Sequence, residues 1–112
     1  MVSRQWRIRL TDAARRDFEE IIDWTASTFG ARQAQSYARV INAAIASLAS
    51  GPSVTGIQVR EDLPAGLRLL SITRRGVRAR HVLVFRTRDA SLVEIVRILH
   101  AAMDIARHLE SQ

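Results

Sequence analysis

The fold of this chain is decided by the segment VEIVRILHAAMDIARHL, residues 93–109. Its first half is β-branched and aliphatic and is interrupted only by Glu94 and Arg97, a composition typical of a buried strand. In its second half, apolar residues recur at helical spacing with charged residues between them. The segment therefore predicts a central strand that leads into a short closing helix, with His100 at the junction.

An N-terminal strand and two long helices are predicted upstream of this segment. Residues 4–10, RQWRIRL, alternate between apolar and basic side chains and predict a half-buried strand. Thr11 and Asp12 offer oxygens to the free amides of a helix start, and Gly30 is a suitable helix end. A second helical pattern begins almost at once and stops before Pro52. Because the break between the helices is short, we expect an antiparallel helical hairpin.

Three extended segments follow the hairpin. Residues 51–66 hold both prolines and three of the five glycines, and they predict a loop. The segments LRLLSI (67–72) and RARHVLVFR (78–86) predict strands joined by a turn, and a second turn leads into the strand of residues 93–99. Consecutive strands joined by short turns are antiparallel, so these segments predict a meander.

The expected fold class is α+β, with a single domain over residues 1–112. We expect the helical hairpin to pack on one face of a mainly antiparallel four-stranded sheet that includes the N-terminal strand. The short C-terminal helix is expected near the other end of the sheet. A hydrophobic content of 47% is enough for one core in a chain of this length.

The charge of the chain points to an anionic partner. The net charge is +6, and all 17 basic residues are arginines, because the sequence contains no lysine. Arginine makes bidentate contacts with phosphate and carboxylate groups. The excess positive charge therefore indicates a nucleic acid, an acidic protein partner, or both.

Several classes of site are disfavoured by composition. The chain has no cysteine, and its three histidines are not paired at helical spacing, so we expect neither a disulfide nor a metal site, and no cofactor. No phosphate-binding glycine loop or nucleophile elbow is present. The N-terminal residues are too polar for a signal peptide, and no apolar run approaches the roughly 20 residues of a membrane span. We therefore expect a cytoplasmic protein that does not associate with membranes.

Five segments, in this order along the chain, resemble the RelE/ParE superfamily of bacterial toxins. The last of them resembles the signature of the ParE branch, in which Ile-Leu-His is followed by two variable residues and Met-Asp. The segments are LTDAARRDFEEIIDWTASTFG (10–30), QAQSYARVINAAIASLASGP (33–52), DLPAGLR (62–68), RHVLVFR (80–86) and RILHAAMDIARHL (97–109).

The resemblance implies the toxin of a type II toxin–antitoxin module that is not an enzyme. Toxins of the ParE branch act on DNA gyrase and block replication, and a cognate acidic ParD-like antitoxin neutralises them in a hetero-oligomer. Such a toxin meets operator DNA only indirectly, through its antitoxin. As residues that contact the target or the antitoxin, we single out Arg68, Arg86, Arg97, His100 and Asp104.

Two other functions remain open from the sequence. A RelE-like toxin would cleave mRNA on the ribosome, and Arg68, Arg86, Arg97, His81 and His100 offer the acid–base and cationic groups for that chemistry. Against this function, the chain has no lysine, and its only tyrosine, Tyr37, lies far in sequence from the meander. We expect His100 to be structural and hydrogen-bonded to Asp104. A small basic DNA-binding protein is the third function, but no helix concentrates arginine as a recognition helix would.

Overall fold

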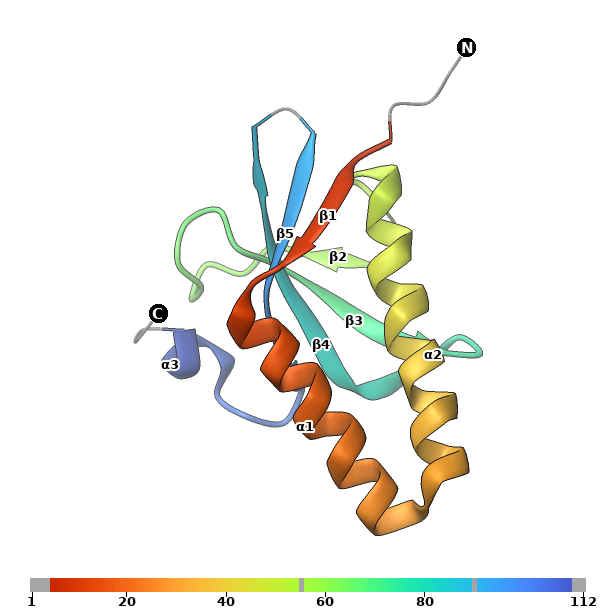
Figure 1. The fold of residues 1–112 in the computed structure, drawn as a ribbon. Helices are drawn as coiled ribbons and strands as arrows, with labels where there is room; N and C mark the ends of the chain where they lie inside the picture. Colours follow the sequence, from red (N-terminus) through yellow and green to blue (C-terminus); the bar gives the residue numbers. More distant parts are fainter. Residues whose placement is uncertain (1–4, 55, 90, 110–112) are drawn as a thin grey trace.

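The computed structural model describes residues 5–54, 56–89 and 91–109, and it begins with strand β1 (Arg7–Leu10) and the two helices of the hairpin (Figure 1). Helix α1 (Asp12–Phe29) is capped by Thr11, whose side-chain oxygen accepts a hydrogen bond from the Ala14 amide at 3.0 Å. The helix ends at Gly30, which has a φ of 96°, a conformation that favours glycine. Helix α2 (Ala31–Ser47) follows directly, so the predicted hairpin is confirmed.

The remaining elements form the rest of the sheet and the closing helix. They are the 3-10 helix η1 (Leu48–Ser50), strands β2 (Ile57–Gln58), β3 (Arg68–Arg74), β4 (Val77–Arg88) and β5 (Leu92–His100), and helix α3 (Ile105–Leu109). The strand order is β1-β5-β4-β3-β2, with β1 parallel to β5 and the other pairs antiparallel. The α+β class is therefore confirmed, and the strand predicted at 93–99 lies inside the sheet, between β1 and β4.

The sheet has five strands rather than the four expected. The additional strand, β2, lies within residues 51–66, which we expected to be a loop, and it pairs with β3. Only two residues take part, and Ile57 packs partly buried against the core. Two residues are too few to produce an alternating pattern, so periodicity could not reveal this strand.

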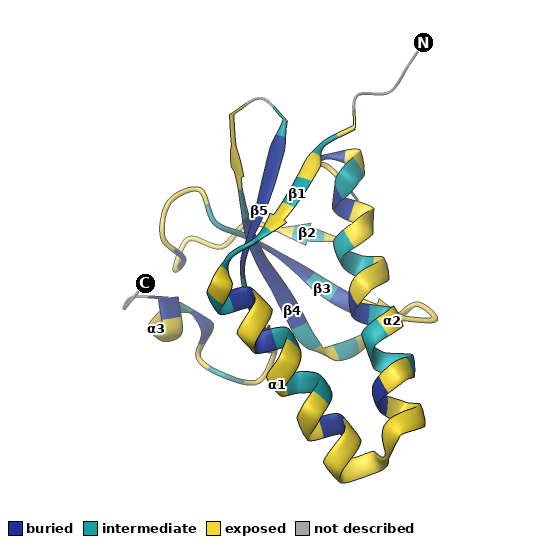
Figure 2. Ribbon diagram, viewed as in Figure 1, coloured by how far each residue is buried: buried dark blue, intermediate teal, exposed yellow. Residues whose placement is uncertain are grey.

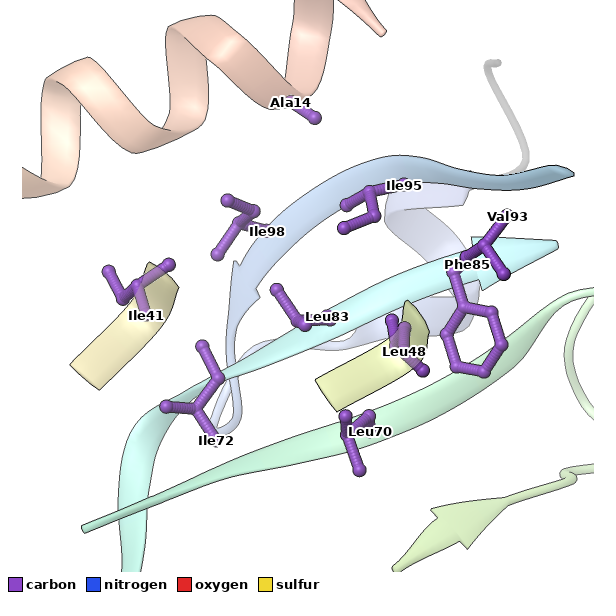
Figure 3. Packing of buried hydrophobic residues seen from close by; sticks show 10 residues of the cluster. All are labelled: Ala14, Ile41, Leu48, Leu70, Ile72, Leu83, Phe85, Val93, Ile95 and Ile98. Carbon is purple, nitrogen blue, oxygen red and sulfur yellow. The ribbon is translucent and has the colours of Figure 1, made fainter. Parts of the chain in front are cut away.

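The larger hydrophobic core lies between the hairpin and one face of the sheet (Figure 3). Figure 2 shows that the buried positions of α1 and α2 are spaced along each helix, while β5 is buried over most of its length and β4 over its central residues, 82–85. Each of the fully buried aliphatic or aromatic side chains stabilises the fold by about 1.5–3 kcal/mol. The core residues are Ala14, Ile41, Leu48, Leu70, Ile72, Leu83, Phe85, Val93, Ile95 and Ile98.

A second, smaller core lies on the opposite face of the sheet. Neighbouring residues along a strand point to opposite faces, so Val82 and Val84 lie opposite Leu83 and Phe85 of the larger core. Helix α3 packs on this second face through Ile105 and Leu109. The sequence pattern shows which residues of this helix are apolar but not which face of the sheet they cover, so its place on the second face was not predicted.

Among the helices in the described part of the chain, none combines the length and the apolarity that a membrane-spanning helix needs.

Candidate functional site

An ion pair between Asp17 and Arg97 links helix α1 to strand β5. Arg97 donates two hydrogen bonds to the carboxylate of Asp17, one from Nε at 2.7 Å and one from a terminal nitrogen at 3.0 Å. The amide of Ile98 donates a third at 2.9 Å. The hydrogen bond with Asp17 raises the pKa of Arg97. Since the side chain of Arg97 is only 18% exposed, its guanidinium holds the fold together and offers little surface to a partner.

Two histidines and a tyrosine meet next to this ion pair. His81 of β4 and His100 of β5 are paired across the strands, with their ring centres 5.3 Å apart in an edge-to-face arrangement. The hydroxyl of Tyr37, from α2, lies 2.7 Å from Nδ1 of His81. The distance of Tyr37 from the meander in sequence therefore does not separate it in space, and that argument against acid–base chemistry is wrong.

Burial holds His81 in its neutral form. Burial of the ring, followed by the unfavourable electrostatic effect of the neighbouring His100 and Arg80, lowers the pKa of His81 from 6.5 to about 4. The neutral ring has one nitrogen free to accept a proton, so the Tyr37 hydroxyl can donate to Nδ1 while Nε2 carries the hydrogen. Burial also raises the pKa of Tyr37, which keeps this hydroxyl protonated at neutral pH.

The depressed pKa of His81 predicts a loss of stability in mild acid. The unfolded chain takes up this proton below pH 6.5 and the folded chain only near pH 4, so stability should fall as the pH is lowered through this window, by about 2 kcal/mol because the ring is only partly buried and solvent screens its charge. Urea unfolding of the His81→Gln variant at several pH values measures the effect. The free energy of unfolding of the wild type minus that of the variant should be larger at pH 8 than at pH 4.5. A difference that does not change with pH would contradict the lowered pKa of His81.

Two adjoining hollows lie around these residues. The first, which we call the histidine groove, measures about 670 Å³ and is lined by Asp17, Trp24, His81, Arg97, His100 and Met103, among others. The second, the aromatic hollow, measures about 390 Å³ and is lined by Trp24, Phe29, Tyr37, Arg74, Val77 and Arg78, among others. Both hollows share Trp24, Arg80 and His81, so they form one continuous surface.

The aromatic hollow exposes large apolar side chains. Trp24 and Phe29 pack edge to face, with ring centres 5.7 Å apart, and both are more than half exposed. Val77 is 67% exposed. Arginines line the same hollow, since Arg74, Arg78 and Arg80 all contribute to its walls. An apolar centre beside cationic side chains is suited to a protein segment that carries both apolar and acidic residues.

A second charged cluster lies on the sheet face that α3 partly covers. Glu94 of β5 is buried, and its carboxylate accepts hydrogen bonds from Arg9 at 2.8 Å and from Arg86 and Arg88 at 2.9 Å each. Burial alone would raise the pKa of Glu94, but the hydrogen bonds from the three arginines outweigh it and lower the pKa to about 2. The carboxylate is therefore ionised throughout the physiological range.

The five predicted site residues do not form one site. Arg97 is paired with Asp17, and Arg86 belongs to the Glu94 cluster. Arg68 pairs across the sheet with Phe85, so it lies on the hairpin face, opposite to Arg86, where it donates to the Pro52 carbonyl at 3.4 Å.

His100 and Asp104 are both exposed near the histidine groove, but the hydrogen bond expected between them is replaced by others. Nδ1 of His100 accepts from the Ala102 amide at 3.1 Å, and Asp104 accepts from the Arg107 amide at 3.3 Å. Each side chain therefore caps its own local turn, His100 after β5 and Asp104 at the start of α3.

Within the described residues, no group of three or more histidines, aspartates or glutamates is arranged to hold a metal ion. The groups that the fold brings together are instead arginines, imidazoles and one tyrosine, whose side chains are of the kinds suited to binding anions and exchanging protons.

Comparisons with known proteins agree with this architecture. A family model described as the ParE toxin of the type II toxin–antitoxin system parDE matches residues 8–105. Toxin ParE1 of Mycobacterium tuberculosis is 32% identical over 103 residues, which cover 92% of this chain and 97% of that protein. Toxin ParE1 of Caulobacter vibrioides is 34% identical over 101 residues, covering 90% of this chain and 95% of that protein.

Two solved structures share the fold. The chromosomal ParDE toxin–antitoxin system from P. aeruginosa contains a chain that matches with a TM-score of 0.73 at 20% identity, covering 88% of this chain and 98% of that one. The toxin–antitoxin complex RelBE2 from Mycobacterium tuberculosis contains a chain that matches with a TM-score of 0.57 at 27% identity, covering 88% of this chain and 94% of that one.

Proposed function

Because the chain belongs to the ParE family of toxins from type II toxin–antitoxin systems, we propose that it inhibits DNA gyrase, blocks replication and is neutralised by a cognate ParD-like antitoxin. The observation that carries this proposal is the family match over residues 8–105, which includes most of the C-terminal segment with the Ile-Leu-His and Met-Asp motif. In this proposal the protein acts in the cytoplasm as a single domain, and it needs no catalytic residue.

The aromatic hollow is the surface that we assign to the antitoxin. An interface that is tight enough to silence a toxin needs buried aromatic anchors, and Trp24 and Phe29 are exposed in the free protein. The arginines of the hollow would attract the acidic segment that the resemblance implies, which speeds association and selects against wrong partners. Binding there would also cover part of the histidine groove, since both hollows share Trp24 and His81.

The residues that we assign to the target are His100 and Asp104, with Arg86 and Arg68 as more distant contacts. His100 and Asp104 are exposed at the turn between β5 and α3, where a large protein can reach them. Arg97 contributes indirectly, because its pairing with Asp17 fixes β5 against α1 and so sets the position of this turn.

Ribosome-dependent mRNA cleavage is the second candidate function, and one observation favours it. Tyr37 is hydrogen-bonded to His81, the ring of His81 packs edge to face against that of His100, and Arg80 lines the same groove, so groups suited to acid–base chemistry are gathered there. A neutral imidazole near cationic side chains is suited to attack on a phosphodiester bond. This function would make the protein an enzyme, and it predicts a different product from gyrase inhibition.

One pair of assays separates the two functions. Released toxin is added to purified gyrase, where supercoiling and cleaved-DNA complexes are measured, and to a translating ribosome extract, where mRNA cleavage is measured. We expect loss of supercoiling with intact mRNA, and about a tenfold weaker effect for the double variant His100→Ala/Asp104→Ala, since each polar contact in an interface is worth about 1 kcal/mol. Codon-specific mRNA cleavage with normal gyrase would refute the proposal.

The same gyrase assay tests the antitoxin surface. The double variant Trp24→Ser/Phe29→Ser should still inhibit gyrase, but adding the antitoxin of the same module should no longer restore supercoiling. Both side chains are more than half exposed in the free toxin, so the variant should fold normally. Full neutralisation of this variant would place the antitoxin on another surface.

A further inference from the structure

Four arginines gather on one face of the sheet, around the buried Glu94. Strands β1, β5 and β4 lie side by side, and their register pairs Arg9 with Glu94 and Glu94 with Arg86. Two residues away, Arg7 pairs with Leu92, and Leu92 pairs with Arg88. Residues directly opposite one another share a face of the sheet, and so do residues two apart on one strand. We call the set of Arg7, Arg9, Arg86 and Arg88 the arginine face.

The arginines of this cluster keep hydrogen-bond donors that can bind an additional anion. Glu94 accepts from Arg9, Arg86 and Arg88, and it is the only carboxylate that these arginines contact in the described part of the chain. Arg86 and Arg88 use only their Nε groups for this bond, so their terminal nitrogens point to no protein acceptor among the described residues. The three side chains remain 41–55% exposed. Glu94 therefore orients the guanidinium groups without using all of their donors.

We propose that the arginine face binds the backbone phosphates of duplex DNA. Guanidinium groups are planar forks that bind phosphate oxygens in pairs, and here they stand on three hydrogen-bonded strands that fix their spacing. Arginines two residues apart on a strand are separated by about 7 Å, and the outer two of three strands by about 10 Å. A patch of this size spans about two to four phosphates of a duplex, which carries one charge per 1.7 Å of its axis.

The residues of the arginine face favour a duplex backbone as the partner over a protein or a single strand. The apolar residue at its centre, Leu92, is only 8% exposed, so the face lacks the apolar anchor that a protein interface needs. It also lacks an aromatic side chain on which an unpaired base could stack. Aromatic anchors lie instead in the aromatic hollow, which is the surface assigned to the antitoxin. Contacts with phosphates alone carry no sequence preference, so binding should not depend on DNA sequence.

This contact goes beyond gyrase inhibition and is separate from any contact with operator DNA through the antitoxin. It needs only the toxin and DNA, so it can fail or succeed independently of the proposed target. If both hold, the toxin can touch gyrase through the turn after β5 and the enzyme's DNA through the arginine face.

The experiment measures binding of the full-length toxin to a fluorescein-labelled 16-base-pair duplex by anisotropy, between 50 and 200 mM salt. The test variant is Arg7→Gln/Arg88→Gln, which leaves Arg9 and Arg86 on Glu94. We expect about tenfold weaker binding at low salt and a slope of log affinity against log salt that is reduced by about 2. The matched control, Arg15→Gln/Arg16→Gln, removes the same charge from exposed positions of α1 and should leave the slope unchanged.

Three results would overturn the proposal. An equal loss in the test and control variants would mean that net charge alone drives binding. A larger loss for a labelled glutamate-rich peptide of matched charge than for the duplex would assign the face to an acidic protein. If circular dichroism shows that the double variant is unfolded, the single variant Arg7→Gln is measured instead. Arg7 does not contact Glu94, so this change leaves the Glu94 cluster intact. A slope for Arg7→Gln that equals that of the wild type would then refute the contact.

Discussion

Replacing Glu94 by glutamine is expected to lower the free energy of unfolding by about 3 kcal/mol at pH 7. The substitution keeps the size of the side chain but removes the charge that holds Arg9, Arg86 and Arg88 together. The three guanidinium groups would then repel one another around a neutral amide that still has a buried position. Urea unfolding at pH 7 measures the loss.

The pH dependence provides a second, independent test of the same site. The pKa of Glu94 is about 2 in the folded protein and about 4.5 in an unfolded chain, so only the unfolded state binds the proton in this range. Stability should therefore be fully present above pH 4.5 and should be lost as the pH falls toward 2. The Glu94→Gln variant should lack this part of the acid transition while keeping the loss between pH 6.5 and 4 that His81 causes.

Single arginine variants are the controls for Glu94. Arg9→Gln leaves two arginines on the carboxylate, and the lost partner is about half exposed, so the expected cost is below about 1 kcal/mol. Equal losses for Arg9→Gln and Glu94→Gln would mean that Glu94 is held by one dominant pair and not by three arginines acting together.

The fold was largely predictable because its signals are local. The spacing of apolar residues, the cap at Thr11 and the stop at Gly30 all lie within single elements, and each is confirmed. What the sequence did not show concerns relations between elements. Periodicity identifies Ile105 and Leu109 as buried but does not specify the sheet face that they cover. The two residues of β2 are a strand because they pair with β3, and no local sequence pattern indicates that contact.

The candidate site was less predictable because it is assembled from distant segments. Tyr37 and His81 are 44 residues apart, and Asp17 and Arg97 are 80 apart, so spacing could not pair them. One signal was present and could have been used. Glu94 is a carboxylate within an apolar strand, and such a position requires cationic partners on the neighbouring strands. The alternating arginines at positions 7 and 9 and positions 86 and 88 were the available partners.

Replacing Asp17 by asparagine is expected to cost about 3–4 kcal/mol of stability. The carboxylate receives three hydrogen bonds on two oxygens, two from Arg97 and one from the Ile98 amide, and both side chains are largely buried. An amide has only one acceptor oxygen, so at least one buried donor loses its partner and the charge of Arg97 is left without compensation. Thermal and urea unfolding measure the loss, and the turn at His100, which this ion pair positions, should become more accessible to hydrogen exchange.

A double-mutant cycle with Arg97→Gln isolates the pair itself. Each single change leaves one charge buried, whereas the double change removes both, so the double variant should be more stable than the sum of the single losses predicts, by about 2 kcal/mol. Glu20→Gln is the matched control, since Glu20 is an exposed carboxylate on the same helix that also raises the pKa of Arg97. It should cost less than about 0.5 kcal/mol. Equal losses for Glu20→Gln and Asp17→Asn would show that Arg97 responds to the general negative charge of α1, and the ion pair would then not be what fixes the helix on the sheet.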